Sequence, residues 1–220
     1  MSEQRTRSDE MAVLFLAAVI VGLFVFWRQE FVEATNRWPY QMGFAKLLIL
    51  GTFGTMIKNR LRTGSYWKVP HLLGEAVIWG VWGIWFTLIF PLCAGGTETI
   101  IAKHLWPNWT ITLGFLPWKP NLWLAFSQSL MINILSGYAF MMMIVHGWVS
   151  SALAQKVLNP VLYLSGLDFG FWGSFVPKSI FIFWLPAHTV TFLLPPEFRV
   201  VSAALLAIVL ALLISFGQKR

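Results

Sequence analysis

The sequence predicts an all-α integral membrane protein, built as a bundle of about six transmembrane helices. Of its 220 residues, 57% are hydrophobic and only 11% are charged, and the mean hydropathy is +0.68. A soluble core of this size could not bury so much apolar surface, whereas a bilayer solvates it directly. Many of the thirteen tryptophans lie near the ends of apolar segments, as is typical of aromatic side chains at the membrane–water interface.

Six apolar segments are long enough for bilayer crossings, because a helix of about 20 residues spans the hydrocarbon core. They cover residues 11–27, 41–57, 69–94, 122–147, 169–194 and 200–217. We expect them to form one helical domain over residues 1–220, with no separate soluble domain. The N-terminus contains acids, and no cleavage site of small residues follows the first segment. We therefore expect a retained first helix and no signal or transit peptide.

The orientation follows from residues 58–68, KNRLRTGSYWK, which contain four basic side chains and no acid. Basic residues concentrate in cytoplasmic loops. This rule places residues 58–68 and both termini on the cytoplasmic side, and it places the long connection 95–121 outside as a re-entrant or interfacial segment. The net charge of +7 is explained by such loops and by anionic lipid at residues 58–68, so no nucleic-acid partner is expected. The lack of a targeting peptide favours a bacterial cytoplasmic membrane.

Enzyme and cofactor signatures are missing from the sequence. Cys93 is the only cysteine, which excludes an internal disulfide and a cysteine-rich metal site. No phosphate-binding loop, nucleophile elbow or catalytic carboxylate pair is present. His146 and His188 are expected at opposite membrane faces, so they cannot ligate one haem. We predict no catalytic residue, metal or cofactor.

The most informative stretch is residues 178–199, KSIFIFWLPAHTVTFLLPPEFR. Pro186 interrupts an apolar span and frees a backbone carbonyl, which a neighbouring group must satisfy. His188 and Thr191 follow it at membrane depth. Polar groups are costly there and usually face a partner helix or a water-filled path.

Matching depths along the spans predicts two polar layers, since a helix advances about 1.5 Å per residue. The outer layer and its surroundings contain Lys46, Gln128, Asn133, His188 and Thr191. The inner layer is an ion pair of Glu75 and Lys178.

Each layer also has a plainer interpretation. Lys46 can extend its charged end to the nearby interface. Glu75 can pair with His71, four residues earlier on the same helix face. Buried polar side chains of small bundles often only hydrogen-bond neighbouring helices.

A spaced motif marks the C-terminal half, in which Trp184-x-Pro186 is followed after five residues by Phe192, then by Pro196 and Arg199 and an apolar helix. This motif resembles the C-terminal signature of the Mpv17/PMP22 family of small organelle membrane proteins. Ser127-Gln128 is similar to the family's Asp-Gln pair, with serine in place of the acid. Thr191 stands where the family has asparagine, and Arg199 comes one residue early. The resemblance implies a helical bundle with channel-like or solute-transport activity, and matching positions at Trp184, Pro186, Gln128 and Arg199.

Together these observations predict a membrane channel or transporter for a small solute or ion. Lys46, Gln128, Asn133, Pro186, His188 and Thr191 are expected along its path. Discontinuous helices mark transporter sites, and an unperturbed histidine titrates near physiological pH, so a proton link through His188 is expected. Besides membrane lipid and the solute, a second copy of the chain is a candidate partner.

Two alternatives stay open. The first is a non-transporting subunit or assembly factor, which would dock another membrane protein through tryptophan-rich faces. The second is a lipid-modifying membrane enzyme, whose interfacial cluster would have to come from His71, Glu75, His146 and Asp168.

Overall fold

The structure is a computed structural model, and it describes residues 7–22, 26–155 and 157–217. These residues form helices joined by turns and one longer loop. They contain no strand, only an isolated bridge between Thr112 and Asn121. The predicted all-α class is therefore confirmed. The chain divides into two compact units, Met1–Pro39 and Tyr40–Arg220, so the predicted single domain stays a prediction.

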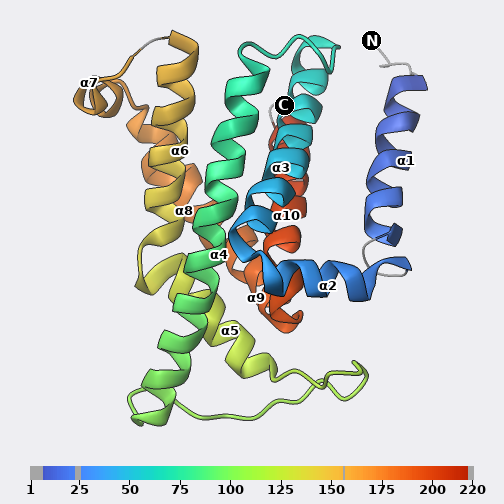
Figure 1. The fold of residues 1–220 in the computed structure, drawn as a ribbon. Helices are drawn as coiled ribbons and strands as arrows, with labels where there is room; N and C mark the ends of the chain where they lie inside the picture. The colour runs from blue at the N-terminus through green and yellow to red at the C-terminus, as the bar shows by residue number, and fades with distance from the viewer. Residues whose placement is uncertain (1–6, 23–25, 156, 218–220) are drawn as a thin grey trace. The chain divides into compact units, whose positions relative to one another are not determined.

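The first unit contains α1 (Arg7–Val21) and the polar helix α2 (Arg28–Arg37) (Figure 1). The Trp27 N–H donates to the Gly22 carbonyl at 2.8 Å. The Trp27 ring lies so close to Gly22 that a larger side chain there would displace it. α1 therefore ends before the end predicted for the span over residues 11–27.

The second unit begins with two long helices, α3 (Pro39–Thr63) and α4 (Leu72–Ala102). Both are longer than the spans predicted over residues 41–57 and 69–94. α3 ends at Thr63, and the next residue, Gly64, has a φ of 78°. This left-handed conformation is common directly after a helix and favours glycine. α4 continues through two consecutive glycines near its C-terminal end, so the connection after it is shorter than predicted.

Glycines bring α3 and α4 together. At the closest approach, a Cβ on Gly43 or on Gly83 would meet the backbone of the other residue. Further along, the Trp79 ring lies against Gly51, and its indole N–H donates to the Thr55 hydroxyl at 2.9 Å. Small residues allow helices to pack this closely in membranes.

The next span is bent instead of straight. It consists of α5 (Leu122–Leu130), the π-turn η2 (Met131–Leu135) and α6 (Tyr138–Gln155). The two parts meet at 52°. Gly137 has a φ of 66°, which breaks the helix, and the Ser136 hydroxyl accepts the Tyr138 N–H at 3.2 Å to start α6. The prediction of one unbroken helix over residues 122–147 is therefore wrong, because the helix breaks near its middle.

After the short helix α7 (Pro160–Ser165), one continuous helical segment alternates π and α turns. Its parts are η3 (Phe171–Phe175), α8 (Val176–Ser179), η4 (Ile180–Trp184) and α9 (Leu185–Leu193). Pro186 lies in the first turn of α9, directly after a π-turn. The proline changes the helix geometry without ending the helix. α10 (Pro196–Gly217) completes the described chain.

Two helices of the described residues are long and apolar enough to cross a bilayer, Leu72–Ala102 and Phe171–Leu193. Leu122–Leu135 and Tyr138–Ala154 qualify as a third when the bent pair is taken as one span. These spans fit an integral membrane protein, whereas six crossings and their orientation stay a prediction.

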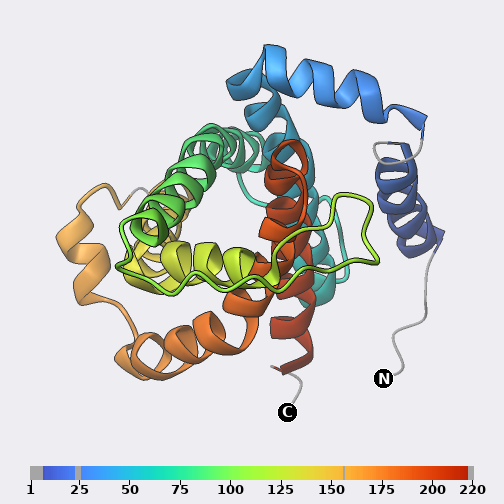
Figure 2. The ribbon, with the colours of Figure 1, turned by 90° about the horizontal axis from the view of Figure 1, so that it is seen from below.

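Within the second unit, α5 packs against α9, and α10 packs against α9 and α4 (Figures 1 and 2). The loop over residues 103–121 runs across the end of the unit that contains α5, and Figure 2 shows the loop in front of this helix. Two indole N–H groups hold it there. Trp118 donates to the Leu193 carbonyl at 2.7 Å, and Trp106 donates to the Ser127 hydroxyl at 3.0 Å.

Candidate functional site

Two of the predicted polar residues, Asn133 and His188, come together where the π-turns η2 and η4 pack against each other. Ser129, which the sequence analysis did not single out, joins them. The Ser129 hydroxyl donates to the Leu185 carbonyl at 2.6 Å, and the Asn133 amide reaches the Trp184 carbonyl at 3.5 Å. These acceptors lie one and two residues before Pro186, so side chains of the bent span bind the backbone of the other segment beside its proline.

His188 joins this network through Asn133. The Asn133 amide nitrogen donates to Ser129 and Trp184, so its oxygen faces the His188 ring, at 2.9 Å from Nδ1. Nδ1 is then the protonated nitrogen, and Nε2 is the acceptor in neutral histidine. The imidazole stacks on the Trp184 ring at 5.3 Å and meets the edge of Phe90 at 6.0 Å.

Local sequence places these groups. Ser129 and Asn133 are four residues apart, so they share one helix face, and the Asn133 amide donates to the Ser129 carbonyl at 2.8 Å. Ser129 is 0% and Asn133 2% exposed. An unpaired polar group at such depth costs about 1–3 kcal/mol. The two side chains are thus an integral part of the helix crossing.

Lys46 and Thr191 lie in separate contacts. Lys46 is buried and donates to the Glu197 carbonyl at 3.1 Å. Thr191 is 0% exposed and shares a 2.8 Å hydrogen bond with the Ser202 hydroxyl, which joins α9 to α10. Of the predicted outer layer, only Asn133 and His188 are hydrogen-bonded to each other.

Gln128 lies near the C-terminal end of α4. Its buried amide donates to the Glu98 carboxylate at 3.4 Å. Arg199 lies in the electrostatic field of the same carboxylate. Partial burial lowers the pKa of the Arg199 guanidinium, and the carboxylates of Glu98 and Glu197 act in the opposite direction. Charged groups of both signs therefore lie near Gln128.

The predicted inner ion pair does not form in this structure. Glu75 accepts a hydrogen bond from Ser150 at 3.5 Å, and the nearest charges that act on it are those of Lys58 and His71. Lys178 is exposed on α8. Glu75 is therefore bonded to Ser150 of α6, and its predicted pairing with His71 stays a prediction.

The residues of the family signature lie around α9 and the start of α10. Phe192 is buried and meets Phe90 edge to face at 5.5 Å. The Arg199 guanidinium lies 5.1 Å from the centre of the Phe192 ring and donates to two carbonyls at the end of α9. Trp184 stacks on His188, and Pro196 is the first residue of α10.

An aromatic site around His146 was missed by sequence reasoning. Its ring lies 4.7 Å from that of Trp79 and 6.3 Å from that of Trp82, and its buried Nε2 has no hydrogen-bond partner among the described residues. Trp79 and Trp82 are three residues apart and share one face of α4. Only the packing of α6 on α4 shows that this face receives His146.

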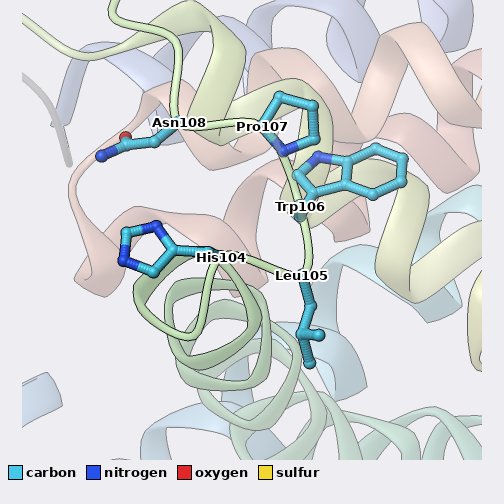
Figure 3. A pocket seen from close by; sticks show the side chains of 5 residues that line it. All are labelled: His104, Leu105, Trp106, Pro107 and Asn108. Atoms are coloured by element: carbon cyan, nitrogen blue, oxygen red, sulfur yellow. The ribbon is translucent and has the colours of Figure 1, made fainter.

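Two shallow hollows open at the loop over residues 103–121. One, of about 360 Å³, is lined by residues 104–108, and the side chains of His104 and Asn108 extend to the same side of the loop (Figure 3). The other, of about 250 Å³, lies beside Glu98 and Trp123. The described residues contain no group of three His, Cys, Asp or Glu side chains that could hold a metal ion.

No family model, curated protein or solved structure matches the chain. The resemblance to the Mpv17/PMP22 family therefore stays a prediction.

Proposed function

We propose that the protein is a membrane channel or transporter for a small solute or ion, whose path passes the crossing of η2 and η4. The observation that supports this proposal is the meeting of two helices with π-turns, one of them bent at Gly137, at Ser129, Asn133 and His188. π-Turns and discontinuous helices recur at functional sites of membrane transporters. Gln128, Pro186 and Thr191 flank this point.

The proposal includes six crossings with both termini in the cytoplasm of a bacterial cell. The basic residues 58–68 would then contact anionic lipid on the inner side. The loop over residues 103–121 would lie outside, with its tryptophans at the interface.

The role proposed for His188 follows from its hydrogen bond. In the neutral ring Nδ1 donates to Asn133, and protonation adds a second donor at Nε2 beside the Trp184 and Phe90 rings. The added charge would draw water or an acceptor to a site closed by aromatic rings. Protonation would thus favour separation of η2 from η4, which opens the path.

Flux into proteoliposomes tests the function, at about pH 4 and about pH 7.5, a range wide enough to include protonation of a buried histidine. We expect wild-type flux to be faster at the lower pH. His188→Gln keeps a donor for Asn133 but cannot titrate, so its flux should not depend on pH. His188→Ala should change the flux at both pH values. His104→Ala, an exposed histidine in the outer loop, is the matched control.

If the flux through His188→Gln depended on pH as in the wild type, the proton link would be disproved, whereas the proposal of transport would stand. No flux with a folded, inserted protein would contradict the proposal and favour the non-transporting subunit.

A further inference from the structure

The hollow beside Glu98 has the walls of a binding site for a small molecule. Trp109 and Trp123 line it, with their ring centres 4.3 Å apart, together with Asn108 and Asn121. Its volume of about 250 Å³ is below the roughly 300–1,000 Å³ of pockets for drug-sized ligands. Only a small solute fits.

Hydrogen bonds hold these walls in place. The Asn121 oxygen accepts the N–H groups of Ile111 and Trp123 at 3.1 and 3.0 Å, and its amide donates to the Trp109 carbonyl at 3.1 Å. The Trp123 indole donates to the Pro107 carbonyl at 2.7 Å. A preformed wall lowers the entropy cost of binding a ligand.

Two polar groups of the hollow stay available to a ligand. The exposed Glu98 carboxylate accepts one hydrogen bond, from Gln128, and has further acceptor capacity. The exposed Asn108 amide makes no hydrogen bond among the described residues and offers both donors and an acceptor. A ligand with several hydroxyl groups can use both residues.

Charge argues against an ionic ligand. Lys103 and Lys119 are exposed in the same loop, and the guanidinium of Arg199 already acts on Glu98. The positive charge of these three groups weakens the attraction of a cation to Glu98, and the Glu98 carboxylate itself repels an anion. A neutral molecule avoids both costs.

We infer that this hollow binds a small neutral solute with several hydroxyl groups, of the monosaccharide or polyol class. Its apolar C–H face packs on the exposed indole of Trp109, and its hydroxyls bond to Glu98 and Asn108. The Gln128 amide touches Glu98 from within the bundle, so the hollow is the outer mouth of the path. This last point rests on the proposed transport function, whereas binding does not.

Binding of D-glucose and sorbitol to the purified protein in detergent tests the inference, by saturation-transfer NMR and tryptophan fluorescence. Trp109→Ala should weaken binding roughly tenfold through loss of the packing surface. Glu98→Gln should weaken it roughly three- to tenfold, because hydrogen bonds to a charged acceptor are the stronger ones. Trp67→Ala changes a still more exposed tryptophan, which lies before α4 and outside this loop, and it should bind like the wild type.

Equal binding by Trp109→Ala and Trp67→Ala would overturn the inference. So would binding of tetramethylammonium or acetate without binding of either neutral probe. Thermal unfolding of each variant shows that it is folded. Retained glucose binding without flux would disprove only the transport function. Retained flux without glucose or sorbitol binding would disprove only this inference.

Discussion

At the scale of single residues, the structure gives specific partners to the polar side chains predicted for the path. Asn133 bonds to the Ser129 hydroxyl, the Trp184 carbonyl and the His188 ring. Lys46 donates to a backbone carbonyl of α10. Each of these bonds stabilises a helix contact, and the pair Asn133–His188 joins the bent span to α9 through two side chains.

A double-mutant cycle of Asn133→Ala and His188→Ala measures this pair. We expect a coupling energy of about 0.6 kcal/mol and at most about 1.7 kcal/mol, the range found for hydrogen bonds between helices in membranes. Unfolding in detergent by a denaturant gives the four stabilities. Asn108→Ala with His188→Ala is the control cycle, because Asn108 lies in the outer loop. A coupling no larger than in that control would show that the bond contributes nothing to stability.

At the scale of elements, glycines decide how the helices meet. Gly43 and Gly83 allow the backbones of α3 and α4 to touch. Gly137 breaks the bent span, because its positive φ is costly for a residue with a Cβ. Gly95 has no neighbour within 4 Å of an added Cβ and stays helical.

Gly83→Ala tests the helix contact. The new methyl would meet the Gly43 backbone, which cannot rotate away, so we expect a loss of about 1–3 kcal/mol of stability. Gly95→Ala in the same helix is the matched control and should keep or slightly raise stability, since alanine is the better helix former. Thermal unfolding in detergent compares the two. Equal stabilities of the variants would contradict the close contact of α3 and α4.

At the scale of the whole molecule, the proposed orientation predicts opposite sides for the two ends of α4. Trp67 and Phe115 are 76% and 80% exposed and lie before and after this helix. With Cys93 replaced by serine, single cysteines at Trp67→Cys and Phe115→Cys report their side. A membrane-impermeant maleimide should label position 115 in right-side-out vesicles and position 67 only in inverted ones. Labelling of both from one side would show that α4 does not cross the membrane.

The sequence by itself determined the helical class, because long apolar runs with few charges can only be helices in a bilayer. It also indicated Pro186 and His188, since both are costly at membrane depth. The sequence could not show that α4 extends to Ala102, because two consecutive glycines, Gly95 and Gly96, usually indicate the end of a helix. In the structure both glycines lie within the helix.

Only the tertiary structure decided which polar groups meet. Asn133 and His188 are 55 residues apart in sequence, and no local pattern relates them. Depth along ideal helices also placed Glu75 beside Lys178, whereas the exposed position of Lys178 leaves Glu75 to Ser150. Depth along a helix gives only one coordinate of a side chain. The direction of the side chain also depends on the rotation of its helix and on the bend at Gly137. Packing between the helices sets both the rotation and the bend.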